Sequence, residues 1–406
     1  MDEPDIKVYA YRWIVLAAFM VITVLNQLLW ITFAPITSDA AAFYGTSDLV
    51  IGLLSMSFML VYILFVLPSA WVIDTWGLYT AVSIGAVLTA LGAMGRGIFA
   101  SDLTLVFISQ IAIALGQPFI LGSITKLAAG WFPISERATA SGLGTLAMYL
   151  GILGGMILTP ILTLRYEIKG MLVIYGVVAL AAAGFFLITA REKPPTPPCL
   201  PGHDERTLMF EGLKSMIRQK DFILLLIIFF IGLGMFNAVT TWIEVIVRPR
   251  GFSISQAGVL GGLMLVGGII GALIMPMISD KLHRRKPFII LALAGLIPGL
   301  VGVTFATNYR LLLVSGFVFG FFLLSSGPIG FQYGAEITHP APEGTSNSLL
   351  LVMGQISGIV FIFTMELLKS PTTGSMTPSL LGLISLMVVC LMLSFFLKES
   401  LVSGSR

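Results

Sequence analysis

The chain has 406 residues, of which 57% are hydrophobic and 11% are charged, and its mean hydropathy is +0.99. Soluble domains carry about 25% charged residues and disordered chains have low hydrophobicity, so the composition excludes both classes and predicts a membrane protein with many spans. The net charge is only +3 and no run of basic residues stands out, so we expect no nucleic-acid partner.

Twelve apolar segments are long enough to cross a bilayer. A membrane-spanning helix needs about 20 residues and a barrel strand about half as many, so these segments are expected to be helices. In chain order they cover about 13–37, 49–73, 79–99, 103–128, 138–162, 170–190, 222–247, 254–278, 287–308, 311–336, 345–367 and 378–397. The proline-rich polar stretch Arg191–Asp221 interrupts the series. It predicts a linker that carries a surface helix over 205–220.

The linker separates two bundles of six helices, over residues 1–190 and 222–406, with residues 191–221 between them. If the N-terminus is cytoplasmic, most of the 23 Lys and Arg residues fall on the cytoplasmic side, as the positive-inside rule requires. We therefore expect both termini in the cytoplasm. The bundle is expected to lie in the plasma (inner) membrane, as a monomer surrounded by lipid bilayer.

The two bundles are related by an internal repeat. Asp74 ends the second span and Asp280, 206 residues later, ends the eighth. Four further residues recur at a separation of 207: Pro133, Glu136, Ser141 and Gly151 match Pro340, Glu343, Ser348 and Gly358. Parallel repeats of six helices, with a site at their interface, resemble the arrangement of major facilitator transporters. The predicted fold is therefore an all-α membrane protein with twelve helices in two six-helix bundles.

The loop after the eighth span contains an acid followed by bases, Asp280-Lys-Leu-His-Arg-Arg-Lys286. This resembles a major facilitator loop signature. A carboxylate at a helix end can accept hydrogen bonds from a neighbouring helix N-terminus and pair with a base. We therefore predict a cytoplasmic gate made by Asp74, Asp280, Arg284, Arg285, Glu336 and Glu343. The first-half copy, Asp74-Thr-Trp-Gly77, lacks the bases, and those of the second half could equally be positive-inside anchors.

No acid, base or histidine is expected near the middle of the bilayer. Glu244 and Glu366 fall near the outer ends of their spans, and Arg96 falls in the outer third of its span, from which it could reach the interface. Since charge inside the membrane is costly and kept for function, this favours facilitated transport of a substrate that is not strongly anionic. One alternative is proton-coupled transport of a neutral or anionic metabolite, drug or haem-like compound through these three residues. Another is a receptor or sensor without turnover.

Uncharged polar and aromatic side chains near mid-depth are the candidates for a substrate site. The ring face of Trp30 suits an organic cation, an attraction worth about 2 kcal/mol or more when desolvated. Amide groups could orient a hydroxyl or amine, although they could also only join helices. The candidates are Asn26, Trp30, Phe33, Gln117, Phe236, Asn237, Trp242 and Gln355.

Nothing in the sequence indicates an enzyme. There is no glycine-rich phosphate loop, no Cys/His set at metal-binding spacing and no nucleophile beside a base. We therefore expect no cofactor and no metal site. The two cysteines, Cys199 and Cys390, lie in a polar loop and an apolar helix and predict no disulfide framework.

Several stretches resemble the feline leukemia virus subgroup C receptor-related transporters, solute carrier family 49. They are Trp30-Ile31, Leu54-Ser-Met-Ser-Phe-Met-Leu-Val-Tyr62, Leu67-Pro-Ser-Ala-Trp71, Gln117-Pro-Phe-Ile-Leu-Gly122 and, most specifically, Gly330-Phe-Gln-Tyr-Gly-Ala-Glu-Ile-Thr-His-Pro340 with Glu343-Gly-Thr-Ser346. The resemblance covers nearly all twelve spans. It implies a major facilitator uniporter that works by alternating access, in a family associated with choline and ethanolamine and, in older assignments, with haem export.

The resemblance also implies roles for single residues. The family's span-one tryptophan matches Trp30, and its glutamines in spans four and eleven match Gln117 and Gln355. A cage tyrosine of span seven falls on Asn237, and an acid in the span-ten stretch falls on Gln332. The lost aromatic weakens cation binding unless Phe33, Phe236 or Trp242 compensates. A small organic solute is therefore expected, with a choline-like cation as the leading hypothesis.

Overall fold

The computed structural model describes residues 8–196, 216, 218–338 and 343–399. The surface helix expected over 205–220 falls almost entirely outside these residues. The chain divides into two compact units. Unit 1 consists of Met1–Phe33 and Asp39–Glu205, and unit 2 consists of Ala34–Ser38 and Arg206–Arg406. The second unit therefore includes five residues from the end of the first apolar segment.

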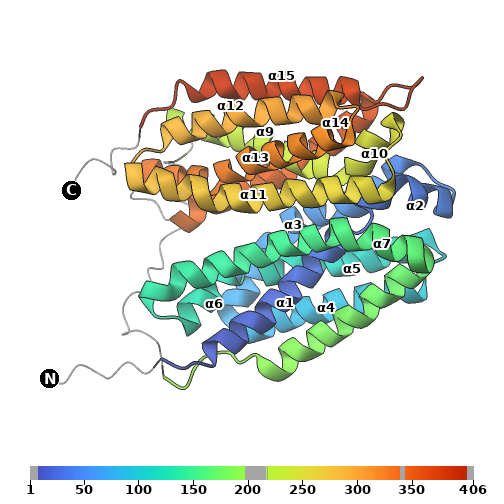
Figure 1. Cartoon of the computed structure of the whole chain (residues 1–406). Helices are drawn as coiled ribbons and strands as arrows, with labels where there is room; N and C mark the ends of the chain where they lie inside the picture. Colours follow the sequence, from blue (N-terminus) through green and yellow to red (C-terminus); the bar gives the residue numbers. More distant parts are fainter. Residues whose placement is uncertain (1–7, 197–215, 217, 339–342, 400–406) are drawn as a thin grey trace. The chain divides into compact units, whose positions relative to one another are not determined.

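The first half of the chain is helical throughout its regular elements (Figure 1). These are α1 (Arg12–Ile31), the short 3-10 helix η1 (Ala34–Ile36), α2 (Thr37–Tyr44), α3 (Asp48–Trp76), α4 (Leu78–Ile98), α5 (Leu103–Leu121), α6 (Ile124–Trp131) and α7 (Ile134–Thr189). Asp102 and Ser47 cap the N-termini of α5 and α3 through their side chains, as short polar residues do at helix starts.

The 56-residue helix α7 holds two membrane spans. Glu167 breaks it with a φ of 57° and a ψ of 175°, and the ribbon in Figure 1 runs out and back around this point. The two predicted segments, 138–162 and 170–190, lie on either side of the break. Within the described ranges, eleven helical stretches are long and apolar enough to cross a membrane. Because α7 crosses twice, they supply twelve crossings, which confirms the predicted fold class.

The second half of the chain follows the same plan. Its helices are α9 (Lys220–Thr241), α10 (Ile243–Val247), η2 (Arg248–Arg250), α11 (Ile254–Leu282), α12 (Lys286–Phe305), α13 (Tyr309–Thr338), α14 (Glu343–Leu367) and α15 (Thr377–Ser394). Within unit 2, α11 and α13 touch backbone to backbone, because a Cβ atom on Gly271 or Gly320 would collide with a carbonyl oxygen of the facing helix. Small residues allow such close packing in membranes.

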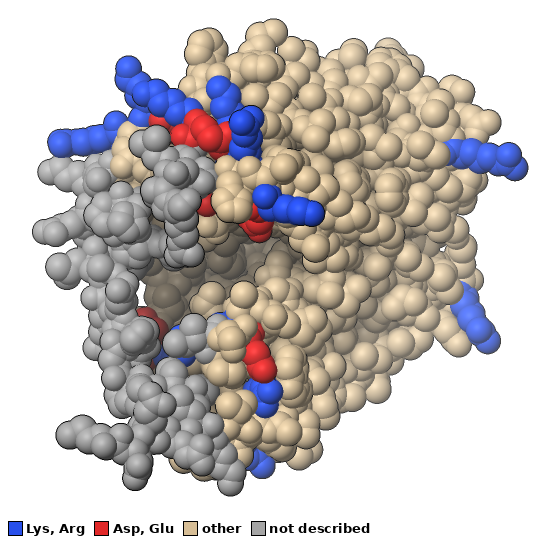
Figure 2. All heavy atoms as spheres, turned by 60° about the vertical axis from the view of Figure 1, so that its left-hand side comes forward, with Lys and Arg blue, Asp and Glu red and all other residues tan. Residues whose placement is uncertain are grey.

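Apolar side chains cover the flanks of both units. Large residues such as Leu64, Ile188, Met277 and Leu367 are exposed, which water would penalise but lipid favours. Figure 2 shows that Lys, Arg, Asp and Glu gather at the face turned forward, whereas the rest of the visible surface is almost free of them. The chain is thus a multi-pass integral membrane protein.

Candidate functional site

The most extensive charged cluster surrounds Arg285 at the start of α12. Helix α11 ends at Leu282, and the next residue, His283, turns the chain through its left-handed conformation. Helix α12 begins at Lys286 with a proline in its first turn. Arg285 lies in this short link. Its side chain is buried, whereas Lys281 and Arg284 are exposed. The turn therefore directs one base of the cluster inward.

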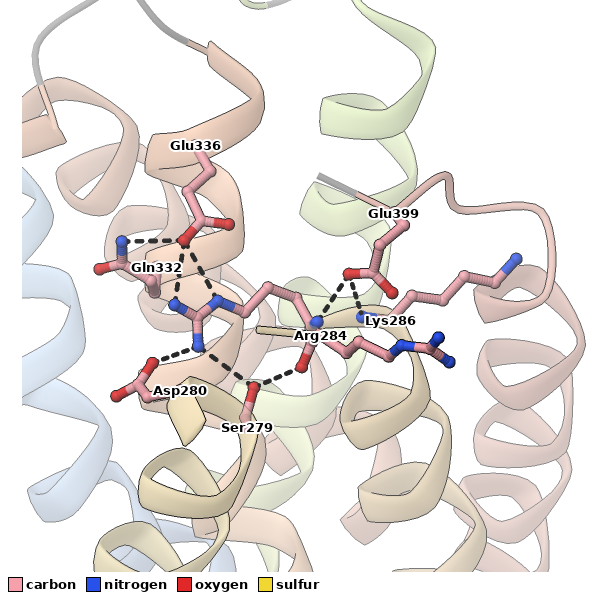
Figure 3. Close-up of polar contacts among 8 residues, drawn as sticks. Ser279, Asp280, Arg284, Lys286, Gln332, Glu336 and Glu399 are labelled. Atoms are coloured by element: carbon pink, nitrogen blue, oxygen red, sulfur yellow. Dashed lines mark hydrogen bonds and ion pairs between the residues drawn. The ribbon is translucent and has the colours of Figure 1, made fainter. Parts of the chain in front are cut away.

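Two acids share the Arg285 guanidinium (Figure 3). Its Nε and Nη2 donate to Glu336 Oε1 at 3.1 and 3.0 Å, and Nη1 donates to an Asp280 carboxylate oxygen. Burial alone would lower the pKa of Arg285, but the hydrogen bonds and negative charges of Glu336 and Asp280 raise it. The guanidinium therefore stays charged, and its charge-assisted bonds are of the strong type.

Glu399 caps α12 from the segment that follows the last helix. Its Oε1 accepts hydrogen bonds from the backbone N–H groups of Arg285 at 2.6 Å and Lys286 at 3.2 Å. A carboxylate at a helix N-terminus satisfies free N–H groups and complements the helix dipole. Two further hydrogen bonds hold the same segment in place. The backbone N–H of Lys398 donates to Asp221, and the backbone carbonyl of Lys398 accepts from the Tyr333 hydroxyl.

The remaining predicted members of this gate lie differently. Arg284 is exposed, and Figure 3 shows its side chain extending away from Asp280 and Glu336. The side chain of Glu343 falls outside the part of the structure that is described. Gln332, which stands where the related family has an acid, donates to Glu336 Oε1 at 3.1 Å. It thus supports the carboxylate that binds Arg285.

Unit 1 has a smaller cluster at the start of α4. Glu192 accepts from the backbone N–H groups of Leu78 at 2.8 Å and Tyr79 at 2.6 Å, so it caps α4 as Glu399 caps α12. Lys126 lies 3.8 Å from Asp74, whose side chain is 79% exposed. The predicted gate residue Asp74 therefore has a base near it, supplied by α6 rather than by the loop.

Sequence reasoning missed the two capping acids, because both lie outside the apolar spans. A usable signal was present: Glu192 and Glu399 are separated by 207 residues, the same separation that relates Glu136 to Glu343. Glu136 itself forms an ion pair with Arg12, at 3.0 Å, within unit 1.

The predicted substrate residues of unit 1 come from α1 and α5. Trp30 is 6% exposed and its indole N–H donates to the Ser55 carbonyl of α3 at 3.0 Å. This bond fixes the plane of the ring. Gln117 is also buried, on α5. Asn26 instead donates to Thr89 at 3.0 Å and to the Ile113 carbonyl at 3.2 Å, so its amide joins α1 to α4 and α5.

The predicted substrate residues of unit 2 come from α9, α14 and the break before α10. Asn237 donates to the Gly354 carbonyl at 3.2 Å, which brings α9 against the turn of α14 that carries Gln355. Phe236 is buried beside it on α9. Trp242 is fully buried and donates to the Ile362 carbonyl at 3.1 Å, which ties the end of α9 to α14.

Glu244, Glu366 and Arg96 lie near helix ends, and each has at least one partner in the protein. Glu244 accepts from the Ser38 hydroxyl at 2.8 Å and its backbone N–H at 3.2 Å, both inside unit 2. Glu366 pairs with Lys369 at 3.4 Å. Arg96 is 0% exposed, so the expectation that it reaches the interface is wrong. Its Nη1 donates to Gln110, and its ring neighbour is Phe33, 5.7 Å from Cζ.

The sequence of this chain is similar to those of known transporters. The profile described as Major Facilitator Superfamily matches residues 19–362. Solute carrier family 49 member A3 of Xenopus tropicalis is 30% identical over 389 residues, which cover 91% of this chain and 80% of that protein. Choline/ethanolamine transporter FLVCR2 of Homo sapiens is 30% identical over 383 residues, which cover 89% of this chain and 72% of that protein.

Solved structures show a similar fold. A bacterial homolog of the human lysosomal transporter Spinster, in an inward-facing and unoccupied conformation, aligns with a TM-score of 0.75 and 16% identity. The alignment covers 96% of this chain and 98% of that one. At this identity the likeness concerns the fold alone.

Proposed function

Because the chain belongs to the major facilitator superfamily and, within it, to solute carrier family 49, we propose that this membrane transporter is a uniporter for a choline-like organic cation. Transport of small organic solutes follows from the family. The cation, the facilitative mode and alternating access are the proposal. Relatives named as choline/ethanolamine transporters support the substrate class.

The observation that carries the proposal is the setting of Trp30. Its ring is buried and held by the hydrogen bond to the Ser55 carbonyl. The indole would therefore bind a cation over its ring face without first having to change its own orientation. The charged side chains that are fully buried, Arg96 and Glu244, lie near helix ends and are bound to other groups. In this proposal the substrate site consists of rings and amides. Such a site suits a quaternary or primary amine, because the ring quadrupole stabilises its charge.

Amide side chains would orient the polar end of the solute. We assign this role to Gln117 on α5 and Gln355 on α14, with Asn237 and Phe236 beside the latter on α9. Asn237 stands where the related family has a cage tyrosine, so this protein would favour solutes with a hydroxyl or a primary amine. Asn26, Phe33 and Trp242 would act mainly by supporting the helices that carry the site.

The gate is proposed at the ends of the helices that carry the acidic loop motif. It comprises Asp74, Asp280, Arg284, Arg285, Glu336 and Glu343. The contacts of Arg285 with two acids support it as the centre of this gate. In this proposal the gate is cytoplasmic, both termini lie on the same side of the plasma (inner) membrane, and the protein works as a monomer.

The decisive experiment measures uptake of radiolabelled choline and ethanolamine into proteoliposomes. Trp30→Ala should raise the substrate concentration that gives half-maximal uptake by about 30-fold, the equivalent of about 2 kcal/mol of cation–π attraction. Trp30→Phe should raise it less, because the phenyl ring keeps part of this attraction. Trp13→Ala is the matched control, because Trp13 is an exposed tryptophan on the same helix. Unchanged saturation in Trp30→Ala would exclude the ring as the cation site.

Two further measurements separate the alternatives. Uptake should persist when a protonophore collapses the proton gradient, whereas loss of uptake would indicate proton coupling through Glu244, Glu366 or Arg96. Counterflow of labelled solute should occur, and its failure with intact binding would indicate a receptor or sensor.

A further inference from the structure

The most deeply buried cation of unit 1 is Arg96, two residues before the end of α4. It is 0% exposed, and only one of its three nitrogens has hydrogen-bond partners. Nη1 donates to Gln110 Oε1 at 2.6 Å and to the Leu29 carbonyl at 3.2 Å. Nε and Nη2 are buried without a partner among the described residues. Three of its five N–H donors are therefore unused by the described part of the protein.

No negative charge of the protein balances this guanidinium. Across residues 8–196 and the other described ranges, no carboxylate lies within 4 Å of Arg96, and its acceptors are a neutral amide and a carbonyl. The face of the Phe33 ring, 5.7 Å from Cζ, adds only a modest attraction. Burying an uncompensated charge is costly, so a counter-charge at the free side of the fork would be strongly favoured.

The surroundings of the fork supply further hydrogen-bonding groups. The Tyr44 and Tyr175 hydroxyls are close enough to interact electrostatically with Arg96, and the Tyr175 hydroxyl is 2.9 Å from that of Thr159. These groups are donors of the kind that surround bound anions.

We propose that Arg96 binds a small monovalent anion, a halide or a carboxylate, inside unit 1. The adjacent Nε–H and Nη2–H donors form the fork that binds planar oxyanions through two bonds, and a halide can lie between the same two hydrogens. A single negative charge neutralises the site. Larger or multiply charged anions would bring excess charge into a region closed to solvent.

The site would also stabilise the region of Trp30. Gln110, which accepts from Arg96, donates to the Leu54 carbonyl at 3.1 Å, and the next carbonyl, that of Ser55, binds the Trp30 indole. Arg96 also holds the carbonyl of Leu29 in the last turn of α1. A bound anion would thus fix Arg96 and, through it, the backbone that orients Trp30. The binding itself does not depend on which solute is transported.

The test is the midpoint of thermal unfolding of the purified full chain at constant ionic strength. Sodium chloride, bromide or formate replaces sodium gluconate, whose anion is too large for the site. We expect a saturable rise of a few degrees, as ligand binding to the native state produces. A stronger response to formate than to the halides would identify a carboxylate as the preferred ligand, and the reverse would identify a halide.

Variants locate the effect. Arg96→Gln should abolish the rise, and Arg165→Gln, which removes an exposed arginine of the same unit, should preserve it. If Arg96→Gln does not fold, Arg96→Lys keeps the charge but loses the fork, and it should require at least tenfold more anion for the half-maximal rise. A wild-type midpoint that does not change with the anion, or an Arg96 variant that responds like the wild type, would overturn the proposal.

Discussion

The starts of α4 and α12 show how one repeat unit has been used in two ways. Both helices are capped by a glutamate from the segment after the sixth or the twelfth span, Glu192 in unit 1 and Glu399 in unit 2. Among the described residues, only unit 2 adds a buried arginine with two acids. In unit 1 the corresponding ion pair is a lysine and an exposed aspartate 3.8 Å apart.

A single extra residue explains the difference. Asp74 and Asp280 are 206 residues apart, but the capped residues Leu78 and Arg285 are 207 apart, so the loop of unit 2 is one residue longer. Gly77 alone lies between α3 and α4, whereas His283, Arg284 and Arg285 lie between α11 and α12. The comparison indicates that the helix cap is shared by both halves and that the ion network belongs to the second half alone.

The largest effect is expected from Arg285→Met. It leaves Glu336 and Asp280 without their common partner, which costs about 3 kcal/mol for a buried pair, at the lower end because Asp280 is 63% exposed. The midpoint of thermal unfolding should fall and uptake should be impaired. Arg284→Met is the matched control, since it removes an exposed neighbouring base. Equal effects of the two changes would remove Arg285 from the centre of the gate.

The next effect is expected from Gly77→Ala. Gly77 has a φ of 92° and a ψ of 173°, a region essentially restricted to glycine, and its added Cβ would collide with the Glu192 carboxylate. Strain of this kind costs about 1–3 kcal/mol. Gly142→Ala, in an open helical position, should be neutral or slightly stabilising. Thermal unfolding of both variants checks the prediction, and a neutral Gly77→Ala would contradict it.

The two caps should then prove equivalent. Glu192→Ala and Glu399→Ala each remove the acceptor of two helix N–H groups, at a cost of about 1 kcal/mol. Hydrogen exchange should accelerate in the first turn of α4 in one variant and of α12 in the other. Lys193→Ala and Lys398→Ala, which change exposed neighbours, serve as controls. Acceleration in only one helix would break the symmetry between the units.

The smallest effect is expected from Asp74→Asn. Exposed ion pairs contribute about 0–1 kcal/mol, and Lys126 keeps its second bond, to the Ile73 carbonyl. The midpoint of thermal unfolding should differ little from that of the wild type at any salt concentration. A loss as large as that of Arg285→Met would mean that unit 1 carries a gate of equal strength.

Hydrophobicity and length were sufficient to predict the twelve spans, because lipid demands long apolar helices. The break at Glu167 lies between the predicted segments 138–162 and 170–190, and Asp280 lies at the end of α11, as the loop motif predicted. The sequence could not distinguish Arg284 from Arg285, because the direction of each side chain depends on one left-handed residue in the turn. It could not reveal Arg96 as fully buried either, since burial depends on packing between helices that lie far apart in the chain.

The assignment of Ala34–Ser38 to unit 2 affects how the protein could be divided. Cutting the chain between residues 197 and 215 would yield a C-terminal fragment that lacks Ser38, and the Glu244 carboxylate would lose both of its bonds to that residue. Such a fragment should assemble correctly only when co-expressed with its N-terminal counterpart. The second half would then depend on a segment from the first half to complete its folding, even though it contains six complete spans.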